Sequence, residues 1–261
     1  MSALRISAEL WRNILLYCPY ATTVSFTFIC QQFRTVSERI RYRKVRLSYR
    51  QALLFFRTLH DRPSLGAHVR SLYLHRPDSS VRHEGSAFEA ALTSMTGLWG
   101  LQIMCPVDVQ ALLGYCHAPL RSFTYGLPSC DALREFLAQQ PFITSIRLYH
   151  PLNRDPTPWF LPMLEKVEAL TVDLADLIVG APVRRISFRY RPEERVTQPV
   201  KPPIFFTLSA VPVVHVECMA CQLVHYNELD RFLPSLETLV VLQDVTWGDR
   251  TESVGRISSI S

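Results

Sequence analysis

Four potential zinc ligands lie within eleven residues of one another: His215, Cys218, Cys221 and His225. Thiolate and imidazole groups are the usual ligands of tetrahedral structural zinc. Such sites normally bring two ligand pairs together across a longer loop. Here His215 lies between Val214 and Val216 in a segment with strand-like alternation, so its side chain would point away from the others. We therefore interpret the two cysteines as small core residues and predict no metal site.

Other residues with catalytic potential have a structural explanation. Cys116 and His117 are adjacent, and adjacent side chains on one element diverge, so they do not form a nucleophile and base. Asp173 and Asp176 are spaced as helix-capping acids. The sequence has no Gly-rich phosphate loop followed by Lys-Ser/Thr and no Gly-x-Ser-x-Gly motif. We predict no catalytic residues, no cofactor and no enzymatic activity.

Composition indicates a globular chain that stays inside the cell. The 261 residues are 48% hydrophobic, enough for a sizeable core. The first apolar segment carries Arg5, Glu9 and Arg12, which a signal peptide would not. The whole chain has seven cysteines, an odd number. We expect them to be reduced thiols and the protein to reside in the cytoplasm or nucleus. The apolar runs are too short to span a membrane, so we expect no membrane partner.

The formal net charge is +5, and the densest basic segment is residues 40–50, in which two tyrosines are interleaved. That composition could bind the phosphates of a nucleic acid. Because Tyr42, Val45 and Leu47 alternate with charged neighbours, we favour a half-buried strand or linker whose arginines are solvated.

The chain opens with a short amphipathic helix. Ser7 can cap it, Glu9 suits its positive end and Pro19 ends it, while apolar residues recur at three-and-four spacing between them. Further apolar residues predict one or two more helices up to about residue 40. A unit of roughly 40 residues is too small to be stable alone, so we expect it to dock on something.

Residues 4–46 resemble the F-box, the helical motif of ubiquitin-ligase substrate adaptors. The residues that carry the resemblance are Glu9-Leu10-Trp11, Ile14-Leu15, Tyr17-Cys18-Pro19, Phe26 to Cys30, Phe33-Arg34 and Tyr42 to Val45. The family has a Leu-Pro pair where this chain has Ile6-Ser7. The resemblance implies docking on the small adaptor Skp and through it on a cullin, with contacts from Ile6, Leu10, Trp11, Ile14, Leu15, Phe28 and Phe33. The alternative is that these helices form the first hairpin of a larger domain.

The rest of the chain repeats. The template apolar-x-x-apolar-x-apolar begins at residues 69, 98, 120, 143, 167, 183, 211 and 236, at a mean spacing of about 24 residues. Candidate helices lie between the matches, which predicts an α/β fold with parallel strands in a solenoid resembling irregular leucine-rich repeats. Four repeats have Pro at the family's ninth position, where Asn or Cys is usual. We predict a helical module at 1–46, a linker helix at 47–66, the solenoid at 67–246 and a polar tail at 247–261.

A recognition surface is the remaining functional feature. Alternation along the strands places one set of side chains on the concave sheet face. We predict that this set binds the target protein through Tyr73, His75, Gln102, Arg147, Tyr149, Arg185, Arg189, His215 and Glu217. The sequence thus predicts a substrate-recognition adaptor of a cullin-RING ubiquitin ligase. The alternatives are a leucine-rich-repeat scaffold without a ligase role and, less favoured, an Arg-rich nucleic-acid binder.

Overall fold

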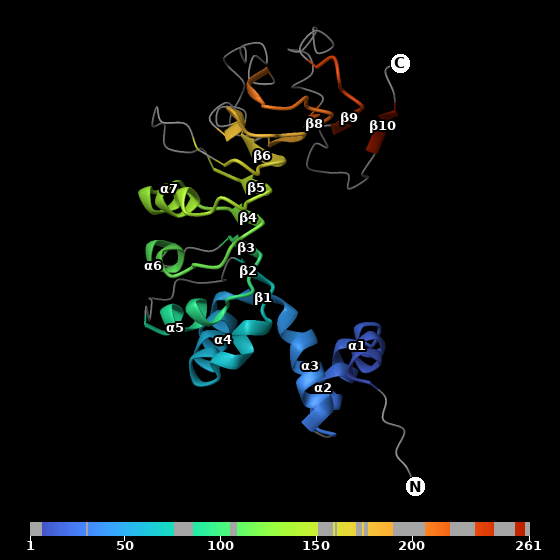
Figure 1. The fold of residues 1–261 in the computed structure, drawn as a ribbon, viewed down its shortest axis with the longest axis vertical. Helices are drawn as coiled ribbons and strands as arrows, with labels where there is room; N and C mark the ends of the chain where they lie inside the picture. Colours follow the sequence, from blue (N-terminus) through green and yellow to red (C-terminus); the bar gives the residue numbers. More distant parts are fainter. Residues whose placement is uncertain are drawn as a thin grey trace, which may run out of the picture. The chain divides into compact units, whose positions relative to one another are not determined.

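The computed structural model describes residues 7–29, 31–75, 86–104, 109–150, 159, 161–170, 174, 177–189, 207–219, 233–242 and 254–258. The chain folds as two compact units, residues 1–120 and residues 121–261. Both are mixed α/β structures (Figure 1).

The first unit opens with three helices, α1 (Ala8–Leu16), α2 (Tyr20–Phe26) and α3 (Gln31–Arg43). The hydroxyl oxygen of Ser7 accepts a hydrogen bond of 3.2 Å from the backbone N–H of Leu10, which caps α1 as the sequence predicts. An aromatic cluster then joins the three helices. Trp11 meets Phe33 edge to face at 4.5 Å between ring centroids, and Phe26 lies 5.3 Å from Phe33.

A parallel three-stranded sheet follows in the same unit. Its elements are β1 (Lys44–Ser48), α4 (Tyr49–Asp61), the 3-10 helix η1 (Pro63–His68), β2 (Ser71–His75), α5 (Ser86–Ser94), β3 (Gly100–Ile103) and α6 (Val109–Gly114). β2 pairs with β1 and with β3. Helices α4, α5 and α6 lie along one side of these strands in Figure 1. Fully buried side chains such as Phe56, Leu72 and Ile103 fill the core between the helices and the strands.

The second unit is a sheet with strands β4 (Ser122–Tyr125), β5 (Ser145–Leu148), β6 (Lys166–Leu170), β7 (Arg185–Arg189), β8 (His215–Met219), β9 (Thr238–Leu242) and β10 (Val254–Ser258). Strands β4 to β9 pair in parallel in sequence order, and β10 pairs antiparallel with β9. Helix α7 (Asp131–Ala138) packs on one face, where Phe136 lies 5.2 Å from Phe123 between ring centroids.

A single register aligns the core of this sheet. Phe123, Ile146, Val167, Ile186 and Val216 follow one another across β4 to β8, and each is at most 1% exposed. Because strand side chains alternate, the neighbouring residues of each strand face the opposite side of the sheet.

All eight template matches coincide with strands, and the predicted parallel α/β arrangement is confirmed. The predicted register of β6 is wrong, however. Leu164 takes the first core position, so Val167 and Ala169 face the core and Leu170 does not align with core residues. At β8 the core residues lie two positions after those that the template beginning at residue 211 predicts. The buried residues are Val213, Val216 and Cys218. That shift keeps the faces of β8 unchanged, because side chains alternate with a period of two.

Strands also occur outside the range predicted for the solenoid. Residues 44–48 form β1 directly after α3, across the predicted boundary between the module at 1–46 and the linker at 47–66, and β1 pairs with β2. The helix predicted as a linker at 47–66 is α4, which packs on the strands. The predicted polar tail, residues 247–261, contains β10, which pairs antiparallel with β9 and so covers its edge.

Candidate partner-binding surfaces

Helix α1 has two apolar faces. Trp11 and Leu15 point into the helical module, where Leu15 is only 1% exposed. Leu10, Ile14 and Tyr17 follow at i, i+4 and i+7 and form a second stripe, with exposed fractions of 50%, 40% and 90%. If α1 served only to cap the fold, the inward-pointing side chains of Trp11 and Leu15 would be its only necessary apolar surface. The second stripe is an apolar surface without a partner inside the described part of this unit.

The turn after α2 adds to the exposed apolar surface of the module. Phe28 is 84% exposed and Ile29 is 60% exposed. Of the predicted docking residues, Leu10, Ile14 and Phe28 are thus open to solvent, while Trp11 and Phe33 are half-buried in the aromatic cluster. Leu15 is only 1% exposed, enclosed by the module, and its contact with the adaptor stays a prediction. Ile6 lies outside the described residues. Sequence reasoning did not select Tyr17 and Ile29, although both belong to the quoted motif.

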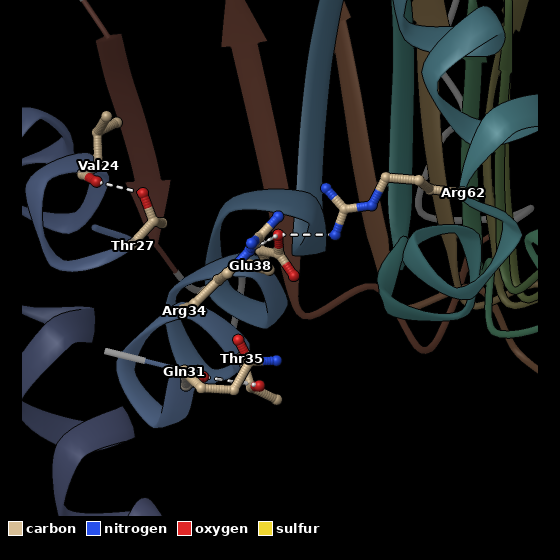
Figure 2. A network of polar contacts seen from close by, with 7 residues as sticks. All are labelled: Val24, Thr27, Gln31, Arg34, Thr35, Glu38 and Arg62. Atoms are coloured by element: carbon tan, nitrogen blue, oxygen red, sulfur yellow. Dashed lines mark hydrogen bonds and ion pairs between the residues drawn. The ribbon is translucent and has the colours of Figure 1, made fainter. Parts of the chain in front are cut away.

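A polar network ties α3 to the segment between α4 and η1. Arg62 Nη2 donates a hydrogen bond of 3.0 Å to Glu38 Oε1, and Arg34 Nε donates one of 3.2 Å to the same oxygen. Figure 2 shows the guanidinium group of Arg62 reaching across to Glu38. Burial alone would raise the pKa of Glu38, but the hydrogen bonds and charges of Arg62 and Arg34 outweigh it and lower the pKa below its ordinary value of 4.5.

Glu38 should therefore make stability depend on pH under acidic conditions. A lowered carboxyl pKa contributes stability that is complete above the unfolded value and is lost as pH falls through the folded value. We expect Glu38→Gln to remove this part of the acid sensitivity. Because Arg34 and Arg62 are 47% and 44% exposed, the effect at pH 7 should be about 0.5–1 kcal/mol. Urea unfolding of the wild type and the variant at pH 7 and pH 4 measures it, and identical losses in both proteins would contradict the assignment.

The predicted face residues of the first unit lie on β2 and β3. Tyr73 pairs in register with Arg46 and Gln102, and the Arg46 guanidinium carbon is 5.9 Å from the centroid of the Tyr73 ring. The His75 ring lies 5.7 Å from the Tyr73 ring. All three predicted residues are half-buried. Arg46 is exposed on β1, as expected for a half-buried strand with solvated arginines.

On the second unit a polar row crosses the face opposite α7. Arg147, Glu168, Ser187 and Glu217 are successive register partners on β5 to β8. Arg147 Nε forms an ion pair with Glu168 Oε2, and Ser187 Oγ donates a hydrogen bond of 3.0 Å to Glu217 Oε2. The row thus carries one positive and two negative side chains, and its arginine is paired within the row. Sequence reasoning selected Arg147 and Glu217 but missed Glu168, because the template was placed three residues too late on β6.

A second row on the same face is basic. Lys166, Arg185 and His215 pair in register at the starts of β6, β7 and β8, with Ser145 before them and Thr238 after them. Arg185 is exposed, and Lys166 and His215 are half-buried. Of the other predicted face residues, Tyr149 follows β5 and is half-buried, and Arg189 ends β7 opposite Leu170.

The residues with catalytic potential are separated or buried. Burial raises the pKa of the Cys116 thiol to about 11, so the thiol stays protonated at neutral pH and is a poor nucleophile. His215 and Cys218 are three apart on β8 and thus lie on opposite faces of the sheet. Cys221, His225, Asp173 and Asp176 lie outside the described residues. Within the described ranges, no group of three or more His, Cys, Asp or Glu side chains could hold a metal ion.

Among the described helices, none combines the length and apolar character that crossing a bilayer requires. In comparisons with known proteins, no protein-family model matches the chain, and no curated protein matches it significantly.

Proposed function

We propose that the chain is a substrate-recognition adaptor of a cullin-RING ubiquitin ligase, with an F-box-like module at 8–43 and leucine-rich-repeat-like strands behind it. The module docks on a Skp-type adaptor, and the sheet faces bind the target protein. Ubiquitin transfer belongs to the partners.

The observation that carries this proposal is the second apolar stripe of α1. An internal aromatic cluster already satisfies the packing of the three helices, so Leu10, Ile14 and Tyr17 have no structural use within the module. Exposed, adjacent apolar side chains on a small helical unit are typical of a protein interface. Ser7 also caps α1 where the F-box family has Pro, so the replacement of Leu-Pro by Ile6-Ser7 leaves the helix start in place.

Copurification with a Skp-type adaptor tests the proposal. The wild-type chain and the double variant Leu10→Asp, Ile14→Asp are each co-expressed with tagged Skp at equal levels. Charges placed in a desolvated apolar interface are costly, so we expect the double variant to reduce capture at least about tenfold.

The matched control is Leu54→Asp, which places the same charge at an exposed leucine of α4. This variant should be captured as well as the wild type, and circular dichroism should show all three proteins folded. Absence of wild-type capture, or equal capture of the double variant, would contradict the adaptor proposal and favour the scaffold without a ligase role.

A further inference from the structure

The basic row at the strand starts of the second unit places two like charges side by side. Lys166 and Arg185 are direct register partners, and like charges opposite each other on a sheet repel. Within the described residues, neither side chain forms an ion pair. Arg147, one row along on the same face, has Glu168 as its partner. An anionic ligand is therefore expected at the first row and not at the second.

The spacing of the row selects the form of that ligand. Neighbouring strands lie about 4.8 Å apart, so Lys166, Arg185 and His215 are placed at steps of about 5 and 10 Å across the strands. Residues i, i+3 and i+7 of an α-helix rise by about 4.5 and 10.5 Å, which matches these steps. Same-face residues of an extended peptide are about 6.8 Å apart and do not match them.

Exposed apolar side chains flank the row at two neighbouring turns. Phe142 and Met163 lie three residues before Ser145 and Lys166 and are 57% and 50% exposed. The row of two cations and an imidazole is thus preceded in the chain by exposed apolar side chains, and an amphipathic helix with acidic and apolar residues would complement both.

From this charge pattern and spacing, we infer that the row Lys166, Arg185 and His215 binds an acidic α-helix of a protein partner, laid across strands β6 to β8 with Asp or Glu at i, i+3 and i+7. The inference rests on the proposed function in naming the class of target segment that the adaptor holds. Binding to this row does not involve the N-terminal module, so it is measured in the absence of Skp and either claim can fail without the other.

The test uses a fluorescein-labelled helical peptide with Glu at i, i+3 and i+7 and Leu at adjoining positions, titrated with the full chain at low salt. A peptide with Gln at the three positions is the comparison. Fluorescence anisotropy should show binding of the Glu peptide, weakened by added salt. We expect the double variant Lys166→Gln, Arg185→Gln to raise Kd about tenfold, since each exposed ion pair contributes modestly.

The control removes two other positive charges. The double variant Arg50→Gln, Arg121→Gln changes two exposed arginines outside the row and should leave Kd unchanged. Equal binding of the Gln peptide, or an equal loss in both double variants, would overturn the inference. So would equally tight binding of a proline-interrupted, non-helical Glu peptide. An oligonucleotide of the same charge that bound as tightly and lost affinity in the same variant would reassign the row to nucleic acid. Circular dichroism of both double variants checks that they are folded, so that a loss of binding is not caused by unfolding.

Discussion

Replacing Phe123 by Ala is expected to lower the free energy of unfolding of the second unit by about 3–5 kcal/mol. Phe123 is 1% exposed and is the β4 member of the aligned core. Its ring contacts Phe136 of α7 and stacks at 6.0 Å with Tyr125 on the same strand. Truncation removes these contacts and leaves a cavity that neighbouring strands cannot fill. The midpoint of urea unfolding, followed by tryptophan fluorescence, measures the loss.

Phe142→Ala is the matched control, because it removes the same ring from an exposed turn of the same unit. Its expected effect on unfolding is within about 0.5 kcal/mol. If both variants lowered the free energy of unfolding by similar amounts, the packing of Phe123 between α7 and the sheet would not be important for stability.

Arg147→Met is expected to lower the free energy of unfolding by about 2 kcal/mol, because it takes the ion-pair partner from a carboxylate that is only 7% exposed. The Arg147 side chain is 38% exposed, so solvent screens the pair and the loss should be smaller than for a fully buried one. Urea unfolding at pH 7 gives the value.

A double-mutant cycle separates this pair from simple loss of packing. The variant Arg147→Met, Glu168→Met should regain much of the stability, because no buried charge remains. Arg121→Met, which replaces an exposed arginine before β4, should be neutral. Additive losses from Arg147→Met and Glu168→Met would contradict a direct interaction.

Apolar periodicity predicted the strands because their core side was fixed by large side chains. The template placed Ile146 and Ile186 at the central core position of their strands, and the structure has them there. At β6 the core positions are Leu164, Val167 and Ala169, and a small Ala beside Leu170 made a shifted register look equally good. Glu168 was missed for that reason, since a shift by three residues, like any odd number, moves a side chain to the other face.

The edges and the helical module were predicted less completely. β10 has few apolar residues, and its pairing with β9 is set by backbone hydrogen bonds that leave no strong side-chain pattern. In α1 the wide apolar stripe was evident in the sequence, but its division into buried Leu15 and exposed Ile14 depends on how α1 packs against α3. The link between Glu38 and Arg62 joins residues 24 apart, beyond the reach of local patterns.

Hydrogen–deuterium exchange of the full chain with and without purified Skp tests whether the helical module docks on the adaptor. We expect slower backbone exchange in residues 8–29 on adding Skp, where Leu10, Ile14, Tyr17 and Phe28 become covered, with no change in residues 131–150 of the second unit. Unchanged exchange across α1 and α2, or protection confined to the sheet, would contradict the docking of this module on the adaptor.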